Sequence, residues 1–406
     1  MVSLRPVTAS KPAAKWRWLF RLFAVSLGLF LGLIVAEISL RFARVGYPLL
    51  YQPDPFCGSR LAPGASGVWI TEGFGHVSIN SLGFRGPEVS AAKSDDVYRI
   101  AVLGDSFIEA LQVDEPFTFR SQLEQQLNSS RKPGDRRYEV INAGVSGYGT
   151  AQELQMLRHY VLPLKPDAVL LAFFPENDIR NNSRRLEGDA ARPYFALAAN
   201  GDLLLDESFK ESKSWTAASS RYERFKARVV NRSRLLQTLR SGKMKLVHGE
   251  AAADVNDVEQ VLQSFVENAD YAYRSSSVSD HVAAWEVTLR LIDEMADECD
   301  RHGAAFSVFT VSTAVQVHPD QKLRDRIAPH GGLDSLFYAE DRVAANCEKR
   351  SIAFFPLASK LQTEADASGD YLHGFDNTAL GLGHWNTRGH AVAAEFVAEW
   401  LMRNGR

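Results

Sequence analysis

The sequence has few cysteines and no excess of positive charge. Its 406 residues include three cysteines, Cys57, Cys299 and Cys347, which is an odd number and too few for a disulfide framework. Cys299 falls on the apolar stripe of a predicted helix, which favours a buried thiol, although a bridge from Cys299 to Cys347 stays open in an oxidising compartment. The formal net charge of −3 gives no reason to expect nucleic acid as a partner.

Motifs that hold cofactors or metals are missing as well. There is no Gly-x-x-x-x-Gly-Lys phosphate loop, no Gly-x-Gly-x-x-Gly dinucleotide turn and no His-Glu-x-x-His zinc helix. The Gly-x-Ser-x-Gly elbow of many serine hydrolases is also absent. His384 and His390 are six positions apart, which does not place both on one helix face for a metal. We therefore expect neither a cofactor nor a metal ion, and we interpret His390 as a helix-packing residue.

The start of the chain is different, because a long uncharged run follows a basic segment. Residues 1–21 carry five Lys or Arg and no acid, and residues 22–36 carry no charge. Residues 19–40 are long enough for a helix that spans a bilayer, which needs about 20 residues. A cleaved signal peptide is the alternative, but no convincing cleavage site follows. Because basic starts stay cytoplasmic, we expect a single-pass inner-membrane protein whose remaining chain is periplasmic or extracellular.

Beyond this anchor, short apolar runs alternate with segments of helical periodicity. Strands that are apolar nearly throughout and separated by helices are typical of a parallel sheet covered on both faces. We therefore predict an α/β fold, a three-layer α/β/α sandwich with a mostly parallel central sheet. The predicted strands cover 98–104, 138–144, 167–174, 304–311 and 351–357, and the predicted helices cover roughly 116–128, 150–161, 280–302, 334–349 and 387–403.

The same pattern divides the chain into parts. We expect the basic start and anchor over 1–45, a Pro- and Gly-rich linker or approach segment over 46–96, and an α/β domain over 97–406. An insert at about 184–279 interrupts the domain and contains the basic stretch 221–245, with nine Lys or Arg against one acid.

The apolar residues of this basic stretch approximate one helical face. We expect that face to pack on the main domain, with the charges in solvent. The alternative is a basic amphipathic helix that lies on anionic lipid headgroups near the membrane. The residues concerned are Tyr222, Phe225, Val229, Leu236 and Leu239.

A serine follows the first predicted strand where the chain turns into a helix, in Gly104-Asp105-Ser106. In an open parallel sheet, ligands bind at the carboxyl ends of the strands, so Ser106 is expected to face the crevice. Unpaired backbone N–H groups and the helix dipole stabilise negative charge there. A serine nucleophile needs a base, and His384, in a Gly-rich turn after the last predicted strand, is the candidate.

Two further strand ends supply polar groups. Gly147 follows the second strand in a Gly-rich turn that can direct backbone N–H groups into the crevice. Asn177 follows the third strand, and its amide can donate a hydrogen bond to an oxyanion. Each residue also has a simpler interpretation, since Gly147 could only shape a turn and Asn177 could cap the next helix.

These segments resemble, in order, the sequence blocks of the SGNH (GDSL-like) hydrolases. Gly104-Asp105-Ser106 is similar to the first block, Ser146–Gly149 to the second and Pro175–Asp178 to the third, and His384 matches the histidine of the last block. The resemblance implies that Ser106 is the nucleophile and His384 its base. It also implies that Ser106, Gly147 and Asn177 form the oxyanion hole, and that the fold is SGNH/flavodoxin-like.

Two positions depart from the family pattern. Pro175 stands where the third block usually has glycine, and Gly381 stands where an aspartate normally precedes the histidine by three residues. An acid that orients the base is worth up to about ten-thousandfold in rate. Asp376, the nearest upstream carboxylate, could orient His384, or a backbone carbonyl could do so and leave a Ser-His dyad. Inactivity is the remaining possibility.

The resemblance implies a membrane-anchored serine esterase that hydrolyses acyl esters, acetyl esters in particular, through an acyl-enzyme. An O-acyltransferase acting on surface polysaccharide would use the same residues, because only the group that resolves the acyl-enzyme differs. A non-catalytic surface-binding or assembly protein is the alternative of another class, suggested by Gly381 and the insert. The expected partners are the lipid bilayer, through residues 19–40, and an acyl ester on a glycan or lipid.

Overall fold

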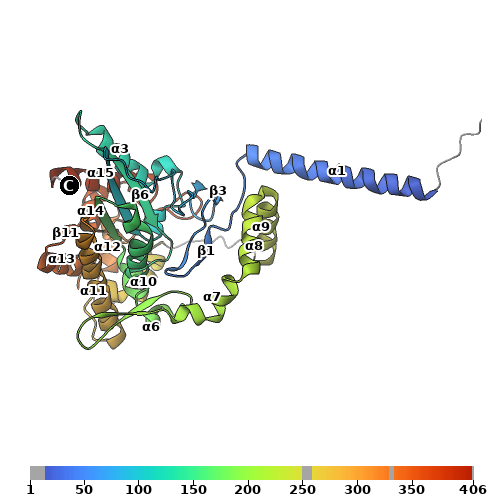
Figure 1. Ribbon diagram of the computed structural model, residues 1–406. Coiled ribbons are helices and arrows are strands. Elements are labelled where there is room, and N and C mark those ends of the chain that lie inside the picture. The colour runs from blue at the N-terminus through green and yellow to red at the C-terminus, as the bar shows by residue number, and fades with distance from the viewer. Residues whose placement is uncertain (1–13, 249–257, 329–332, 405–406) are drawn as a thin grey trace, which may run out of the picture.

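The computed structural model describes residues 14–248, 258–328 and 333–404 (Figure 1). At its centre lies a five-stranded sheet in the order β11-β10-β7-β5-β6, in which every neighbouring pair is parallel. All five predicted strands form, and the α/β class with a parallel central sheet is confirmed. The strands are β5 (Val97–Gly104), β6 (Arg137–Gly144), β7 (Ala168–Phe173), β10 (Ala305–Thr310) and β11 (Ala353–Phe355).

The sheet buries both of its faces, because alternate residues of each strand enter different hydrophobic clusters. In β5, Ala101 and Leu103 join one cluster, whereas Ile100 and Val102 join the other. The first cluster is covered by α4 (Thr150–Met156), α11 (Ser279–Arg301) and α13 (Tyr338–Arg350). The second is covered by α3 (Phe119–Ser129), α14 (Leu357–Ser368) and α15 (Thr387–Arg403). The result is the three-layer arrangement expected from the strands.

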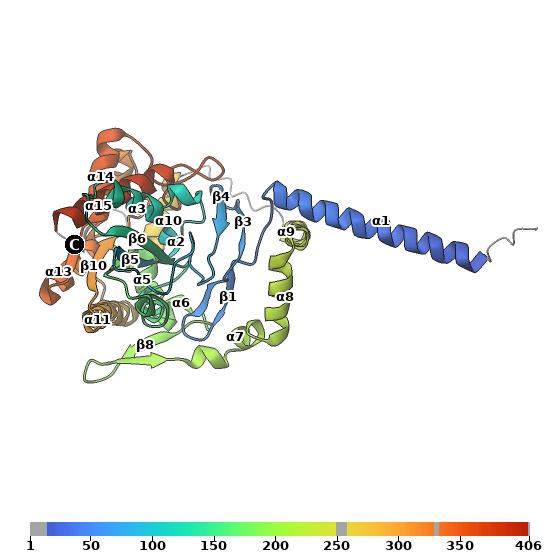
Figure 2. The ribbon, with the colours of Figure 1, turned by 45° about the horizontal axis from the view of Figure 1, so that its top comes forward.

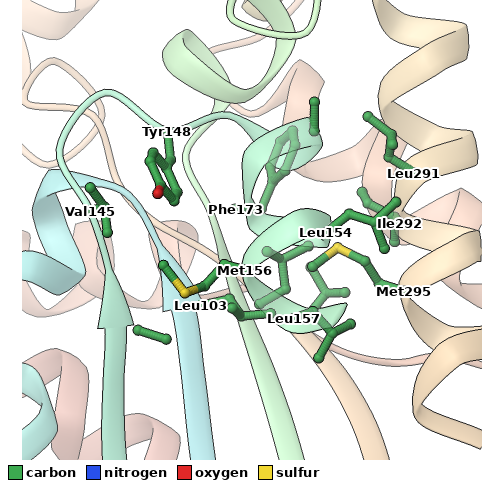
Figure 3. Packing of buried hydrophobic residues seen from close by; sticks show 14 of the residues in the cluster. Leu103, Val145, Tyr148, Leu154, Met156, Leu157, Phe173, Leu291, Ile292 and Met295 are labelled. Atoms are coloured by element: carbon green, nitrogen blue, oxygen red, sulfur yellow. The ribbon is translucent and has the colours of Figure 1, made fainter. Parts of the chain in front are cut away.

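Figure 3 shows how the first cluster closes over the sheet. Leu154 of α4 lies beside Ile292 of α11, in the same cluster as Leu103 of β5 and Phe173 of β7, and all four side chains are fully buried. Burying each such side chain stabilises the fold by about 1.5–3 kcal/mol. This packing fixes the strands whose carboxyl ends carry the polar residues singled out above.

The strand order places a topological switch point at β5. The chain crosses from β5 to β6 on one side and then to β7, β10 and β11 on the other. Ligand crevices of open α/β sheets form where the strand order reverses in this way. Short helices follow the strand ends there: α2 (Ser106–Glu109) after β5 and α5 (Pro175–Arg180) after β7, with α12 (Gln321–Ile327) further along the chain.

The segment expected to be a linker belongs instead to the folded domain. Residues 51–78 form two antiparallel hairpins, β1 (Tyr51–Asp54) with β2 (Gly58–Leu61), and β3 (Ser66–Trp69) with β4 (Gly75–Ser78). Cys57 and Leu61 have no exposed surface. The linker prediction was wrong because the glycines mark tight turns: Gly58 has a φ of +82°, and a Cβ there would lie 2.2 Å from the Ala191 carbonyl oxygen.

The insert leaves the sheet after α5 and returns at α11, passing close to the end of the N-terminal helix on its way (Figures 1 and 2). Its last helix packs on the main domain through Leu262 and Val266. The elements of the insert are α6 (Arg184–Glu187), β8 (Tyr194–Leu197), β9 (Leu203–Asp206), α7 (Lys213–Ala218), α8 (Arg221–Arg232), α9 (Arg234–His248) and α10 (Val258–Asn268).

The helix α1 (Ala14–Phe42) extends away from the domain (Figures 1 and 2). Its residues Trp16–Phe42 are long and apolar enough to cross a membrane, a test that a signal sequence also passes. The three cysteines are buried and free, so the bridge from Cys299 to Cys347 is not formed.

Candidate active site

Ser106 is held at the edge of the sheet by a tight strand-to-helix turn. A side chain at Gly104 would lie 2.6 Å from Ile108, so only glycine lets β5 run directly into α2. Asp105 caps α2 by accepting a hydrogen bond from the Phe107 amide at 3.0 Å. Its other carboxylate oxygen accepts a 2.6 Å hydrogen bond from the side chain of Asn177. Asp105 therefore fixes the positions of Ser106 and Asn177 relative to each other.

The structure brings Ser106 and His384 together across 278 positions of sequence. The Oγ atom of Ser106 lies 2.8 Å from Nε2 of His384. The His384 side chain keeps 26% of its surface exposed, so the pair is open to a ligand. This is the separation that direct proton transfer between a hydroxyl and a base requires.

The third group is Glu72, which no motif in the sequence singles out. Its Oε2 atom lies 2.5 Å from Nδ1 of His384, and its Oε1 atom accepts a 2.8 Å hydrogen bond from the His384 amide. The expectation that Asp376 or a backbone carbonyl orients His384 is therefore wrong. Asp376 is exposed to solvent, whereas the Glu72 side chain is only 17% exposed.

Gly381 stands at the usual aspartate position because that position has no room for a side chain. Its φ is +79°, which disfavours other residues, and a Cβ there would lie 2.7 Å from the His318 ring. Glu72 reaches the imidazole from a different segment, the turn between β3 and β4. Nothing in the spacing of the histidine block points to that turn.

The electrostatics of the pair fit a carboxylate that supports a base. Burial raises the pKa of Glu72, but the hydrogen bond and charge of His384 outweigh it and leave the pKa below the ordinary value. Burial lowers the pKa of His384, but Glu72 outweighs it and leaves that pKa above the ordinary value. An ionised carboxylate only accepts hydrogen bonds, so Nδ1 of His384 carries the proton and Nε2 accepts from Ser106.

The turn that carries Glu72 is fastened to the His384 loop. The side chain of Asn377 accepts a 2.8 Å hydrogen bond from the Gly73 amide and donates a 3.0 Å hydrogen bond to the Gly73 carbonyl. Gly383 allows the close approach, because a Cβ at this position would lie 2.1 Å from Oε1 of Glu72. The two glycines and Asn377 thus set the distance between the acid and the imidazole.

A buried chain of hydrogen bonds supports the loop that carries His384. The Trp385 indole donates to Ser312 at 2.9 Å, and Ser312 lies 3.0 Å from Nε2 of His373. Nδ1 of His373 lies 2.6 Å from the carbonyl oxygen of Gly383, which precedes His384. Burial lowers the pKa of His373 to about 4, so its imidazole is neutral and can donate to that carbonyl.

A cavity of about 270 Å³ opens at Ser106 and His384. Asn177 lines it, so three of the predicted site residues share one space. Glu176 also lines it and accepts a 2.6 Å hydrogen bond from Tyr273, and burial raises the pKa of Glu176 to about 7. The remaining walls are Gly383 and apolar side chains, two of them from the insert: Phe107, Phe174, Leu262, Phe265, Ala314 and Val315.

Gly147 lies in a turn of the expected kind but lines a different cavity. Its φ is +73°, and its carbonyl accepts hydrogen bonds from Asn181 at 2.9 Å and Arg192 at 3.0 Å. The cavity beside it measures about 350 Å³ and is bordered by Trp215 among others, but not by Ser106. The role of the Gly147 amide as an oxyanion donor stays a prediction.

Two other positions have structural explanations. Pro175 is the first residue of α5, a position that tolerates proline because the N–H there has no helical partner. His390 is buried in α15 with its ring edge-on to Trp385, and burial lowers its pKa to about 3. Within residues 14–248, 258–328 and 333–404, no group of three or more His, Cys, Asp or Glu side chains is placed to hold a metal ion.

No family profile matches the sequence, and no curated protein sequence is similar to it. Solved structures that match in shape include an alpha/beta hydrolase enzyme from the metagenome of Lake Arreo, at 12% identity and a TM-score of 0.37, over 78% of this chain and 97% of that one. A GDSL-like lipase from Bacteroides thetaiotaomicron matches at 12% identity and a TM-score of 0.33, over 78% and 93%. An acetylxylan esterase from Geobacillus stearothermophilus, solved as a catalytic mutant, matches at 11% identity and a TM-score of 0.37, over 78% and 97%.

These similar structures include a GDSL-like lipase, the class that the sequence blocks resemble. Their identities and TM-scores are too low to carry a conclusion about activity.

Proposed function

We propose that this chain is a membrane-anchored serine esterase that hydrolyses small acyl esters. The supporting observation is a chain of two contacts at the mouth of a cavity. Oγ of Ser106 lies 2.8 Å from Nε2 of His384, and Oε2 of Glu72 lies 2.5 Å from Nδ1 of His384. A nucleophile, its base and an acid that orients the base are the parts that a serine esterase needs.

In the proposed reaction, Oγ of Ser106 attacks the ester carbonyl carbon while its proton passes to Nε2 of His384. Glu72 stabilises the imidazolium that forms. The oxyanion accepts hydrogen bonds from the Asn177 amide and from the backbone N–H groups of Ser106 and Gly147, and such donors are worth roughly 3–4 kcal/mol each. The C–O bond of the ester then breaks, and His384 returns the proton to the leaving alcohol.

Water completes the cycle. His384 takes a proton from the water as it attacks the acyl carbon, and the proton returns to Ser106 as the carboxylic acid is released. A cavity of about 270 Å³ with mostly apolar walls has room for an acyl group, acetyl included, with the alcohol part of the ester outside. We propose that this alcohol belongs to a glycan or a lipid at the cell surface.

The first experiment treats the full chain in detergent with a fluorophosphonate probe and measures acetate release from p-nitrophenyl acetate. The expected result is labelling and turnover by the natural sequence, and neither by Ser106→Ala or His384→Ala. Ser214→Ala is the matched control, because Ser214 borders the cavity beside Gly147 and not the one at Ser106. Absence of labelling in the natural sequence would favour a non-catalytic binding protein.

A second measurement separates hydrolysis from acyl transfer. Acetate release is followed with and without excess polysaccharide, and the polysaccharide is then examined for new acetyl esters. Hydrolysis predicts an unchanged rate of acetate release and an unmodified acceptor. Acetyl groups appearing on the acceptor would replace the esterase proposal with that of an O-acyltransferase.

We also propose that α1 stays in the chain as the anchor and that the domain faces the periplasm or the exterior. The basic residues before the apolar run support this orientation. Alkaline carbonate washing of isolated membranes should leave the full chain in the pellet. Protease added to spheroplasts should degrade the domain, and release of a chain shortened at its start would indicate a signal peptide instead.

A further inference from the structure

The two helices α8 and α9 of the insert expose apolar and basic side chains that the proposed reaction does not use. Tyr222, Phe225 and Val229 recur at helical spacing, and 70%, 64% and 40% of their surfaces are exposed. In α9, 39% of Leu236 and 62% of Leu239 are exposed. The expectation that this face packs on the main domain is therefore wrong.

The opposite side of α8 makes the contact with the domain. Asn231 accepts a 2.8 Å hydrogen bond from the Leu49 amide and donates one of 2.8 Å to the Leu49 carbonyl. Ala227 and Val230 are partly buried on the same side. Asn231, Ala227 and Val230 thus occupy the face of α8 that contacts the domain. The larger apolar side chains lie on the exposed face.

Basic residues surround the exposed apolar side chains. Within residues 14–248, 258–328 and 333–404, the side chains of Arg221, Arg224 and Arg228 have no hydrogen bond or ion pair with another residue, and all three residues are exposed. Aromatic and aliphatic groups flanked by unpaired arginines are typical of helices that lie in the headgroup region of anionic membranes.

The start of α9 is bonded to the last turns of α1. Glu37 of α1 accepts hydrogen bonds from the Leu235 amide at 2.9 Å, the Arg234 amide at 3.1 Å and the Ser233 hydroxyl at 2.9 Å. Arg41 donates to the carbonyl oxygen of Arg232. These contacts fix the corner between α8 and α9 at the depth where α1 ends.

With α1 across a bilayer as proposed above, that depth corresponds to the headgroup layer. The apolar span of 27 residues is about 40 Å long, which exceeds the hydrocarbon core of about 30 Å and reaches into both headgroup layers. Both α8 and α9 run across the axis of α1 rather than along it, on the side of the domain nearest to α1 (Figures 1 and 2). Helices in this position extend along the membrane surface.

We propose that α8 and α9 form an interfacial arm, residues 221–248, whose exposed apolar side chains insert among anionic lipid headgroups. The proposal rests on the anchoring of α1 proposed above. The arm gives the domain a second attachment to the bilayer, so that the domain cannot swivel about the short segment after Phe42. Its exposed arginines select anionic over zwitterionic lipid.

The test places single spin labels on the full chain reconstituted into phosphatidylglycerol and phosphatidylcholine vesicles. The natural cysteines are buried, so a label attaches selectively to an introduced surface cysteine. Labels at Phe225→Cys and Leu239→Cys report on the arm, and a label at the exposed Ala367→Cys in α14 is the control in water. Each label is read by its collisions with lipid-soluble oxygen and with a water-soluble nickel complex.

The expected result is a ratio of oxygen to nickel collisions several-fold higher at 225 and 239 than at 367. Replacing Arg221, Arg224 and Arg228 with glutamine should reduce that ratio towards the value at 367, as should vesicles of phosphatidylcholine alone. Equal ratios at 225, 239 and 367 would overturn the proposal. Dipolar broadening between labels at 225 on two chains, without oxygen contact, would overturn it in favour of a contact between copies.

A label at Leu29→Cys in α1 separates this proposal from the anchoring on which it rests. If position 29 reads as lipid and position 225 as water, the anchor holds and the arm does not bind lipid. If position 29 also reads as water, the anchoring itself fails. Leu29 is 66% exposed, so the label does not disturb packing within the chain.

Discussion

Replacing Glu72 with glutamine is the sharpest test of the proposed catalytic group. Glutamine keeps the size of the side chain but removes its charge, and its amide N–H₂ cannot accept a hydrogen bond. Oε2 of Glu72 accepts from Nδ1 of His384 at 2.5 Å, and Oε1 accepts from the His384 amide at 2.8 Å. One of these contacts must therefore become a clash of two donors, or His384 must turn to the wrong tautomer.

The size of the effect follows from the geometry. A hydrogen bond to a charged group is worth about 1.5–3 kcal/mol. Two unit charges about 4 Å apart at an effective dielectric of about 20 attract by about 4 kcal/mol, and this attraction exists only once His384 is protonated in the transition state. These contributions overlap, so we expect a loss of about 3–5 kcal/mol, or about a hundredfold to several thousandfold in kcat/KM.

The assay is the pH dependence of kcat/KM for p-nitrophenyl acetate. In the proposed mechanism, activity requires neutral His384, so it should rise with pH through the pKa of that imidazole. Glu72 holds this pKa above its ordinary value against the effect of burial, so the rise should move to lower pH in Glu72→Gln. Asp376→Asn is the matched control and should leave both rate and profile unchanged. The reasoning is refuted if the two variants behave alike.

Further substitutions test the surroundings of the site and the burial of a carboxyl group. Gly383→Ala should lower kcat about a hundredfold, because its Cβ would displace Glu72, and should also cost about 1–2 kcal/mol of stability, because the φ of Gly383 is +70°; circular dichroism melting measures that cost. Asn377→Ala frees the Gly73 turn and should lower kcat about tenfold with KM unchanged, whereas an unchanged kcat would contradict the fastening role. Burial raises the pKa of Glu109 from 4.5 to about 7, so the folded state retains a proton that the unfolded chain releases. The stability that this provides is fully present below pH 4.5 and is lost as pH rises through about 7, by up to about 3 kcal/mol. Glu109→Gln should flatten this decline in denaturant unfolding, and an equal slope in both proteins would contradict it.

The sheet was predictable because its strands are buried on both faces. An apolar run such as 167–174 must be covered on both faces to be shielded from water, and β7 forms there at Ala168–Phe173. Ser106 directly follows β5, as the rule for the carboxyl ends of parallel strands predicts, whereas His384 lies beyond α14 and was identified from its Gly-rich turn and from the order of the sequence blocks. What the strand pattern could not provide is a group that reaches this edge from outside the sheet.

Glu72 escapes prediction for that reason. It lies in a turn of 46–96, where short hairpin strands leave little periodicity and the Pro and Gly content is typical of a linker. The nearest signal is Gly73, which must be glycine because its φ is +63° and a Cβ there would lie 2.4 Å from the Gln112 carbonyl oxygen. A glycine next to an acid is too common a pair to reveal a catalytic turn.

The amphipathic pattern of 221–245 is visible in the sequence, but the side that packs is not. Helical spacing groups Tyr222, Phe225 and Val229 on one face without saying what that face touches. In the folded chain, Asn231 forms the clamp to Leu49, and a polar pair of this kind has no periodic signature. Which face of this amphipathic helix packs on the domain therefore had to come from the three-dimensional structure.

The origin of Glu72 in the segment between the anchor and the sheet has a practical consequence. Trimming the gene to the part that begins with β5 would yield a polypeptide that keeps every strand of the central sheet, Ser106 and His384, yet lacks the proton-orienting carboxylate. Proteolysis just after Phe42 would instead release a domain that keeps Glu72, because both hairpins follow Phe42 in the chain. Soluble versions of this protein should therefore start between Phe42 and Gly46, because Gly46 and Leu49 form hydrogen bonds with the domain.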